Sequence, residues 1–299
     1  MSVTLLAGHP PAQHTAAFHG RIGRDARSGH YAVPRRYRLH LSTACPDGLR
    51  VAVTHSLLGL DDICPAVYLP AVPDCPDGGH TALRPLYDAS AHRYPGPALG
   101  PVLSDDWSGR IVSTHAPDIA RDLARHFRGD RPQLYPCDAE SEIDAVAQMC
   151  AAGIESAAQH VGSAGGGEEE ERAAAAEELT ETLDALERWL AGREYMIRDH
   201  LTAADVELWV TLVQLDTVHR HHLDAAAVQH IAGHPTLWAY ARRLASHPAF
   251  GTHLDLDGIA RRHHARCQGL EAAGAAVQIL DWAAHADGAP ANRPQINQL

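Results

Sequence analysis

The chain lacks lysine altogether: all 25 of the basic residues among its 299 are arginine, against 37 acidic residues. Its formal net charge of −12 argues against nucleic acid or an anionic membrane surface as a partner. No apolar run reaches membrane-spanning length, and the N-terminus has no basic start and too short an apolar stretch for a signal peptide. We therefore expect a soluble cytoplasmic protein with no membrane partner.

Several motifs with known chemistry are also missing. There is no Gly-rich phosphate loop ending in Lys-Ser/Thr and no Gly-x-Ser-x-Gly elbow, so neither a nucleotide enzyme nor a serine hydrolase is supported. The six cysteines form no dense disulfide framework, no zinc-knuckle spacing and no Cys-x-x-Cys pair, which fits a reducing compartment. They are Cys45, Cys64, Cys75, Cys137, Cys150 and Cys267.

What is present is a cysteine placed for nucleophilic chemistry. Cys45 ends a short apolar strand and precedes Pro46, a residue suited to the first position of a helix. Unpaired backbone N–H groups and the positive end of the helix dipole favour a thiolate there. A buried, inert cysteine beside a proline is the alternative interpretation, and these residues alone leave both open.

The order of expected elements divides the chain into an α/β part and a helical part. Strands are expected at 37–41, 64–69, 100–103 and 111–112, and helices follow at about 46–58 and 117–127. The first strand-helix-strand unit predicts a parallel pair. We expect a turn-rich segment at 70–97.

After residue 136 the sequence predicts helices only. One covers 140–160, a second contains Leu179, Leu183, Leu186 and Leu190, a third is a buried helix that begins at a capping box of Thr202 and Asp205, and a fourth covers 235–247. The expected domains are an arm (1–36), a thioredoxin-like α/β domain (37–128), a linker (129–140), an all-helical domain (141–270) and an unstructured tail (271–299).

These features resemble the glutathione transferase fold over roughly residues 20–267, and within it the xi class, the glutathionyl-hydroquinone reductases. The matching segments are Ala44-Cys45-Pro46, Pro101-Val102-Leu103, Leu201-Thr202-Ala203-Ala204-Asp205-Val206, Leu212-Val213-Gln214-Leu215-Asp216 and Pro235-Thr236-Leu237-Trp238.

The resemblance implies a mechanism and a set of site residues. Cys45 matches the family's nucleophile, which attacks the sulfur of a glutathionyl-hydroquinone before a second glutathione resolves the mixed disulfide. Pro101 matches a cis proline that presents the backbone of Gly100 to the thiol. Pro46 and Arg50 complete the expected thiol-binding residues, and the family resemblance also implies a homodimer.

The sequence departs from the family at this site. Asp47-Gly48-Leu49 stand where the family has Trp-Ala-His, and Asp47 places a carboxylate beside the thiol, which opposes the thiolate. The Glu-Ser pair that holds the γ-glutamyl end aligns with His115-Ala116, so His115 is a candidate for binding a carboxylate or hydroxyl. Tyrosines of the quinone pocket align with His219, His263 and His264.

The histidine clusters at 219–222 and 263–264, together with Cys267, raise the question of a metal. His219 and His222 share a helix face, but there is no His-Glu-x-x-His, so pocket-lining or solvated histidines are the preferred interpretation and no metal is expected. In the pocket, His263 and His264 could donate a proton to a leaving phenolate.

Two functions follow from these observations. The first is a cysteine-dependent oxidoreductase or transferase that removes glutathione, or another low-molecular-weight thiol, from an aromatic or quinone conjugate. The alternative is a catalytically weak protein of this fold that binds apolar ligands in the cleft between its domains.

Overall fold

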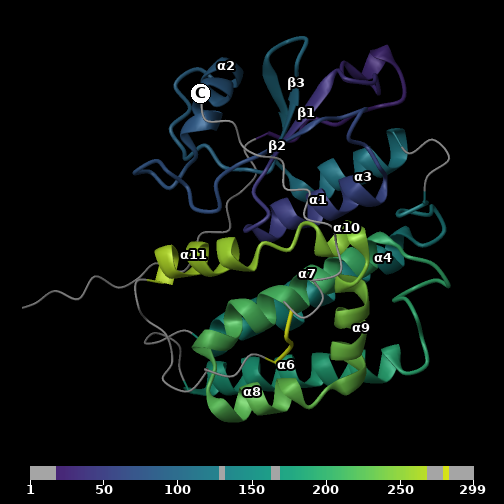
Figure 1. The fold of residues 1–299 in the computed structure, drawn as a ribbon, viewed down its shortest axis with the longest axis vertical. Helices are drawn as coiled ribbons and strands as arrows, with labels where there is room; N and C mark the ends of the chain where they lie inside the picture. The colour runs from purple at the N-terminus through teal and green to yellow at the C-terminus, as the bar shows by residue number, and fades with distance from the viewer. Residues whose placement is uncertain (1–17, 128–131, 163–168, 268–278, 283–299) are drawn as a thin grey trace, which may run out of the picture.

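The computed structural model describes residues 18–127, 132–162, 169–267 and 279–282. A four-stranded sheet in the order β2-β1-β3-β4 forms the N-terminal part (Figure 1). Its strands are β1 (Tyr37–Leu41), β2 (Ala66–Tyr68), β3 (Val102–Asp105) and β4 (Arg110–Ser113). β1 pairs with β2 in parallel and with β3 in antiparallel orientation, and β3 and β4 form the expected hairpin.

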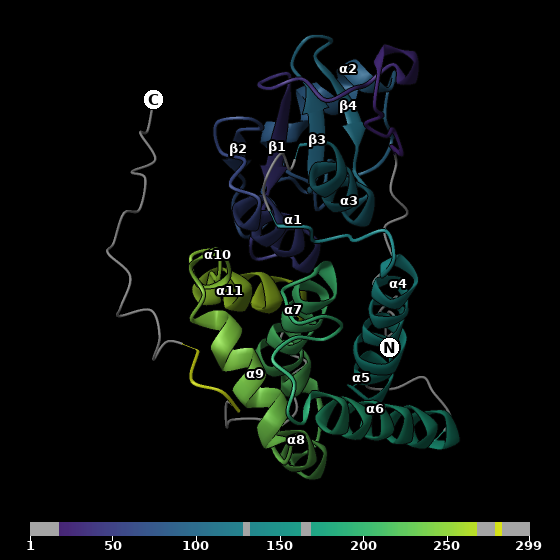
Figure 2. The same ribbon diagram turned by 90° about the vertical axis from the view of Figure 1, so that its right-hand side faces the viewer.

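One face of this sheet carries two helices, α1 (Pro46–Leu57) and α3 (Ala116–His126). The alternation along β1 predicts one covered face of the sheet. In the structure Tyr37, Leu39 and Leu41 are fully buried, while the residues between them are half-buried. Figure 2 shows α1 and α3 between the sheet and the helical part of the chain. The helix that follows Cys45 therefore lies at the junction of the two parts.

The segment 70–97 is not only turns. It contains the short helix α2 (Arg84–Ser90), which has Pro85 in its first turn and is preceded by a 3₁₀ turn, η2 (Thr81–Leu83). Tyr87 of α2 is buried in a small second core with Leu83, and its hydroxyl donates to the carbonyl of Leu99. A single buried tyrosine gives too little apolar period for a seven-residue helix to be recognised in the sequence.

The C-terminal part consists of helices among the described residues, as expected. Their bounds are α4 (Glu140–Met149), a π-helical turn η3 (Cys150–Ser156), α5 (Ala157–Gly162), α6 (Glu169–Leu190), α7 (Ala203–Thr217), a 3₁₀ turn η4 (His219–His222), α8 (Ala225–Ala232), α9 (Pro235–Ala245), α10 (Pro248–Gly251) and α11 (Leu256–Cys267). The predicted fold class, a thioredoxin-like α/β part followed by helices, is confirmed. The exact domain boundaries stay a prediction.

Helix α7 is the centre of the helical part, and it is buried almost all round. Its N-terminus has the predicted capping box, in which Thr202 and Asp205 satisfy each other's backbone groups. Asp205 also accepts from the backbone N–H of Met196 and the hydroxyl of Tyr240, both at 2.8 Å. This buried carboxylate thus ties α7 to α9 and to the loop after α6.

Described residues near both ends of the chain pack on the rest of the protein, and for the tail this corrects the expectation that it lacks structure. In the arm, Ile22 is buried in the main core, and His19 forms a bridge with Ser113 of β4. In the tail, Leu280 and Trp282 are buried and donate to Asp216 of α7 through a backbone N–H and an indole N–H. Residues 1–17, 268–278 and 283–299 lie outside the described part, and no described helix is long and apolar enough to cross a membrane.

Candidate active site

Cys45 is the N-cap residue of α1, as the sequence predicts. Its backbone is extended, with φ −100° and ψ 134°, and Pro46 occupies the first turn. The thiol is half-buried and forms no disulfide. The first turn lies tightly on the preceding loop, because a Cβ atom on Gly48 would come 2.1 Å from the carbonyl oxygen of Ser42. That contact fixes where the helix begins, and therefore where the Cys45 side chain emerges.

The Gly100–Pro101 peptide bond is cis, as the family resemblance implies. The register of the sheet places this bond beside the loop that leads to Cys45, because His40 at the end of β1 faces Val102 at the start of β3. A Cβ atom on Gly100 would lie 3.3 Å from the backbone oxygen of His40, so the two segments run in close contact. Cys45 and Gly100–Pro101 thus lie at the same end of the two central strands, β1 and β3.

Arg50 lies one turn further along α1 and faces the helical part of the chain. Its Nε donates to Glu207 of α7 at 2.6 Å and its Nη2 to Glu155 at 2.5 Å. Thr211 also donates to Glu155, at 2.9 Å. Burial lowers the pKa of Arg50, but the nearby carboxylates outweigh this effect and the pKa is raised. Burial also raises the pKa of Glu207. The contacts of this guanidinium with Glu155 and Glu207 therefore join the two parts of the protein.

His115 is the N-cap residue of α3, where the family has its Glu-Ser pair. Its Nδ1 lies 2.9 Å from the carboxylate of Asp118 without hydrogen-bond geometry, and its ring stands 5.3 Å from that of His19. Arg21 reaches the same carboxylate at 2.9 Å and pairs with Asp122 as well. A ligand carboxylate at this helix terminus would meet an acidic group that already has a cationic partner.

The three predicted pocket histidines have different surroundings. His219 is half-buried, and burial lowers its pKa to about 4 although Glu155 acts in the opposite direction. His263 is buried, with its Nε2 2.8 Å from Nε2 of His222. His264 is exposed. The structure therefore gives these three positions no common environment.

Two of the six thiols are unsuited to catalysis. Burial raises the pKa of Cys64 and of Cys150 to about 12, so neither forms a thiolate near neutral pH.

Sequence reasoning missed Glu155 and Glu207 as partners of Arg50, since nothing local links residues more than 100 positions apart. Cys267 stands with the histidine clusters in the sequence, where the spacing argued against a metal. The fold nevertheless places Cys267 beside His222, and His263 and Cys267 have the i, i+4 spacing of one helix face.

A mixed four-stranded sheet with a cysteine at the start of its first helix, followed by helices around a buried capped one, defines the glutathione transferase fold. The family model for the C-terminal domain of glutathione S-transferase matches residues 169–243. The glutathionyl-hydroquinone reductase PcpF of Sphingobium chlorophenolicum is 31% identical over 244 residues, which cover 76% of each chain. The chain therefore belongs to the glutathione transferase superfamily, among the xi-class glutathionyl-hydroquinone reductases.

Solved structures agree with this assignment. A glutathione transferase from Gordonia bronchialis is 28% identical with a TM-score of 0.74, over 86% of this chain and 84% of the other. The xi-class glutathione S-transferase of Phanerochaete chrysosporium is 26% identical with a TM-score of 0.69, over 83% and 90% of the two chains. The likeness extends over both the sheet and the helical part.

Proposed function

We propose that this protein is a cysteine-dependent thiol reductase of the glutathionyl-hydroquinone reductase type. Its substrate is an aromatic or quinone-derived conjugate of glutathione or of another low-molecular-weight thiol, and Cys45 is the nucleophile. The observation that carries the proposal is the position of Cys45 at the N-cap of α1 with a half-buried thiol. Unpaired N–H groups of the first turn favour the thiolate at this position.

The reaction balances with two thiols and one conjugate. The Cys45 thiolate attacks the sulfur of the conjugate, an S–S bond forms and the aromatic C–S bond breaks. The electron pair of that bond takes up a proton, which restores a C–H bond on the released hydroquinone. A second small thiol then attacks the mixed disulfide, which releases the small-molecule disulfide and returns Cys45 to a thiolate. The conjugate is reduced and the two small thiols are oxidised.

A resolving thiol from outside fits the surroundings of Cys45. Cys64 and Cys150 are buried thiols with raised pKa values, so they are poor attacking groups. Pro46, Gly100 and Pro101 remain the proposed contacts of the thiol substrate. His219, His263 and His264 remain the proposed positions along the aromatic part, although their different burial argues for unequal roles.

The identity of the thiol depends on the start of α3. Asp118 lies beside His115 and is paired with Arg21, so the γ-glutamyl end of glutathione, which carries both a carboxylate and an ammonium group, would meet an acidic group there, as it does at the Glu of the family's pair. Asp47 adds a second acidic group in the first turn of α1.

Asp47 also favours the alternative, a catalytically weak protein that binds apolar ligands between the domains. Alkylation of Cys45 by iodoacetamide as a function of pH separates the two. Rapid labelling that persists well below the free-thiol value of ~8.5 supports the reductase, whereas labelling that requires pH at or above it supports the binding protein. The proposed homodimer is checked separately by sedimentation.

Intact mass spectrometry after exposure to oxidised thiols tests the proposal itself. The wild-type protein is mixed with oxidised glutathione and, in parallel, with disulfides of other small thiols. We expect one adduct, mapped to Cys45 and absent from Cys45→Ser, and the disulfide that forms it fastest identifies the thiol. Cys137→Ser, which removes an exposed cysteine, is the matched control. Failure of every disulfide to modify Cys45 would refute the proposal.

A further inference from the structure

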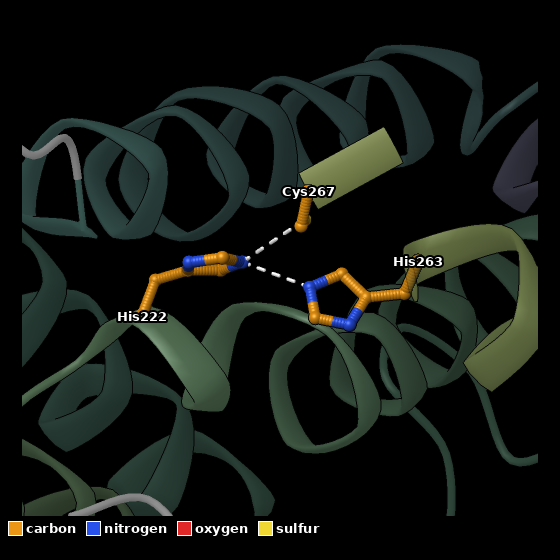
Figure 3. Close-up of side chains that lie close together, drawn as sticks. All are labelled: His222, His263 and Cys267. Atoms are coloured by element: carbon orange, nitrogen blue, oxygen red, sulfur yellow. Dashed lines mark hydrogen bonds between the residues drawn. The ribbon is translucent and has the colours of Figure 1, made fainter. Parts of the chain in front are cut away.

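Three potential metal ligands meet at the C-terminal end of α11. Nε2 of His222 lies 2.8 Å from Nε2 of His263 and 3.5 Å from Sγ of Cys267 (Figure 3). The three ligand atoms all lie within 4.8 Å of one another. His263 and Cys267 occupy i and i+4 on α11, while His222 comes from η4, so segments about 40 residues apart supply the group.

Hydrogen bonding alone explains this convergence poorly. A ring nitrogen of a neutral imidazole has either one proton or one lone pair, and both lie in the plane of the ring. Nε2 of His222 has two close neighbours, Nε2 of His263 and Sγ of Cys267, and it can form a well-aligned hydrogen bond with only one of them at a time. A cation between the three atoms accepts a lone pair from each of them.

We propose that His222, His263 and Cys267 form a binding site for a divalent cation of the zinc type. Two imidazoles and a thiolate are the ligands that Zn²⁺ prefers, at about 2.0–2.1 Å from nitrogen and about 2.3 Å from sulfur. A tetrahedron of that size separates N from N by about 3.3 Å and N from S by about 3.6 Å. The observed separation of 2.8 Å between the two ring nitrogens requires the rings to move slightly apart, and that of 3.5 Å between His222 and Cys267 already agrees.

Neighbouring groups hold the segments that carry the site. Two of the arginines beside it have partners elsewhere: Arg220 donates to the carbonyl of Asp216 at 2.7 Å, and Arg262 to the carbonyl of Ala71 at 3.1 Å. On the other side, Gly162 of α5 packs against His222, since a Cβ there would lie 2.6 Å from Cβ of His222. The backbone that carries His222 is therefore held by a neighbouring helix.

Two other groups of possible ligands in the described part of the chain are weaker. His19, His115 and Asp118 include a carboxylate that is already paired with Arg21. Asp184, His230 and His234 are mostly exposed and contain no thiol. With three protein ligands from the described residues, the site at Cys267 leaves a fourth position for water or a small ligand, as in open zinc sites. The inference is independent of the proposed thiol chemistry at Cys45.

Cobalt titration of the chelator-treated full-length protein tests the site. Co²⁺ bound by a thiolate gives a near-ultraviolet charge-transfer band, which only a site containing Cys267 produces among the three groups. We expect this band at one equivalent in the wild-type protein, and its loss when Zn²⁺ displaces Co²⁺. Cys267→Ser should abolish the band, and His222→Ala should weaken Co²⁺ binding at least about 100-fold, more than loss of an outer contact costs.

Matched variants keep the result unambiguous. Cys137→Ser removes an exposed thiol elsewhere, and His264→Ala removes the exposed histidine next to His263, so both should keep the band. Cys45→Ser should keep it as well, which separates this site from the proposed nucleophile. Circular dichroism of the metal-free Cys267→Ser protein verifies that it is folded. A wild-type protein without the band, or a band that survives in Cys267→Ser, overturns the proposal.

Discussion

Arg50 of α1 donates its Nε to Glu207 of α7 at 2.6 Å, with only 12% and 17% of the two side chains exposed. The helix that begins at Cys45 is thereby held to the central helix of the other half of the protein. Glu155, from the π-helical turn, binds Nη2 of the same guanidinium at 2.5 Å. The position of the proposed nucleophile thus depends on contacts made by the helical part.

We predict that Arg50→Ala lowers the free energy of unfolding by about 3 kcal/mol, because it leaves Glu207 and Glu155 without their counter-charge in a largely buried place. Chemical denaturation measures the change. Arg38→Ala is the control, since its ion pair with Asp106 is 39% and 36% exposed and should contribute no more than about 1 kcal/mol. Equal losses in the two variants would contradict the role given to Arg50.

A methyl group at Gly48 should disturb the start of α1. The Cβ of Gly48→Ala would come 2.1 Å from the backbone oxygen of Ser42, so the first turn must shift, at a cost of about 1–3 kcal/mol. We expect slower alkylation of Cys45 along with lower stability. Asp47→Ala changes the neighbouring, exposed position and should keep the stability within about 1 kcal/mol. A Gly48→Ala protein as stable and as reactive as the wild type would refute the close contact.

The native protein should leave two of its six thiols unmodified. Burial holds the pKa of Cys64 and Cys150 at about 12, so iodoacetamide at pH 8 should not reach them before the protein unfolds. Peptide mapping after labelling, with and without denaturant, counts the modified sites. Modification of Cys64 or Cys150 under native conditions, at the rate of exposed Cys137, would show that these thiols are not enclosed.

Acid should destabilise the protein partly through His219. Its pKa falls from 6.5 to about 4 on folding, so the unfolded chain binds a proton that the folded one refuses between these values. The free energy of unfolding therefore decreases as the pH falls through this window. Replacing His219 by Gln should reduce the loss between pH 7 and pH 5 by about 2 kcal/mol, since one pKa unit corresponds to about 1.4 kcal/mol.

His253, whose pKa is also lowered to about 4 by burial, provides an independent comparison. His253→Gln should give a reduction of the same sign, and the double variant should show the sum of the two because the sites are separate. Urea denaturation at the two pH values measures both. An unchanged pH dependence in the single and the double variants would contradict the assigned burial of these rings.

The sequence predicted those elements whose apolar residues follow a single period. Tyr37, Leu39 and Leu41 alternate because one face of the sheet is buried. Leu179, Leu183, Leu186 and Leu190 recur at helical spacing and are all buried in α6. In the site, local signals likewise placed Cys45 at a helix start. These features depend on neighbours in the chain, which sequence patterns record.

What could not be predicted depends on pairing between distant segments. Asp216 holds Trp282 from a tail expected to lack structure, and the two are 66 residues apart. The contact between His222 and His263 spans 41 residues, so only the fold brings them together. The position of Arg50 between two glutamates is of the same kind. Such contacts follow from the packing of helices and leave no periodic trace in the sequence.

The role of Cys45 as the nucleophile is tested by the release of hydroquinone from a glutathionyl-hydroquinone, followed with wild-type protein and Cys45→Ser under excess small thiol. We expect the wild type to turn over and to form the small-molecule disulfide in equal amount. Cys45→Ser should lose at least about 1000-fold in rate, as expected when a nucleophile is removed, while Cys137→Ser keeps the wild-type rate. Turnover by Cys45→Ser within about tenfold of the wild type would show that another group is the nucleophile.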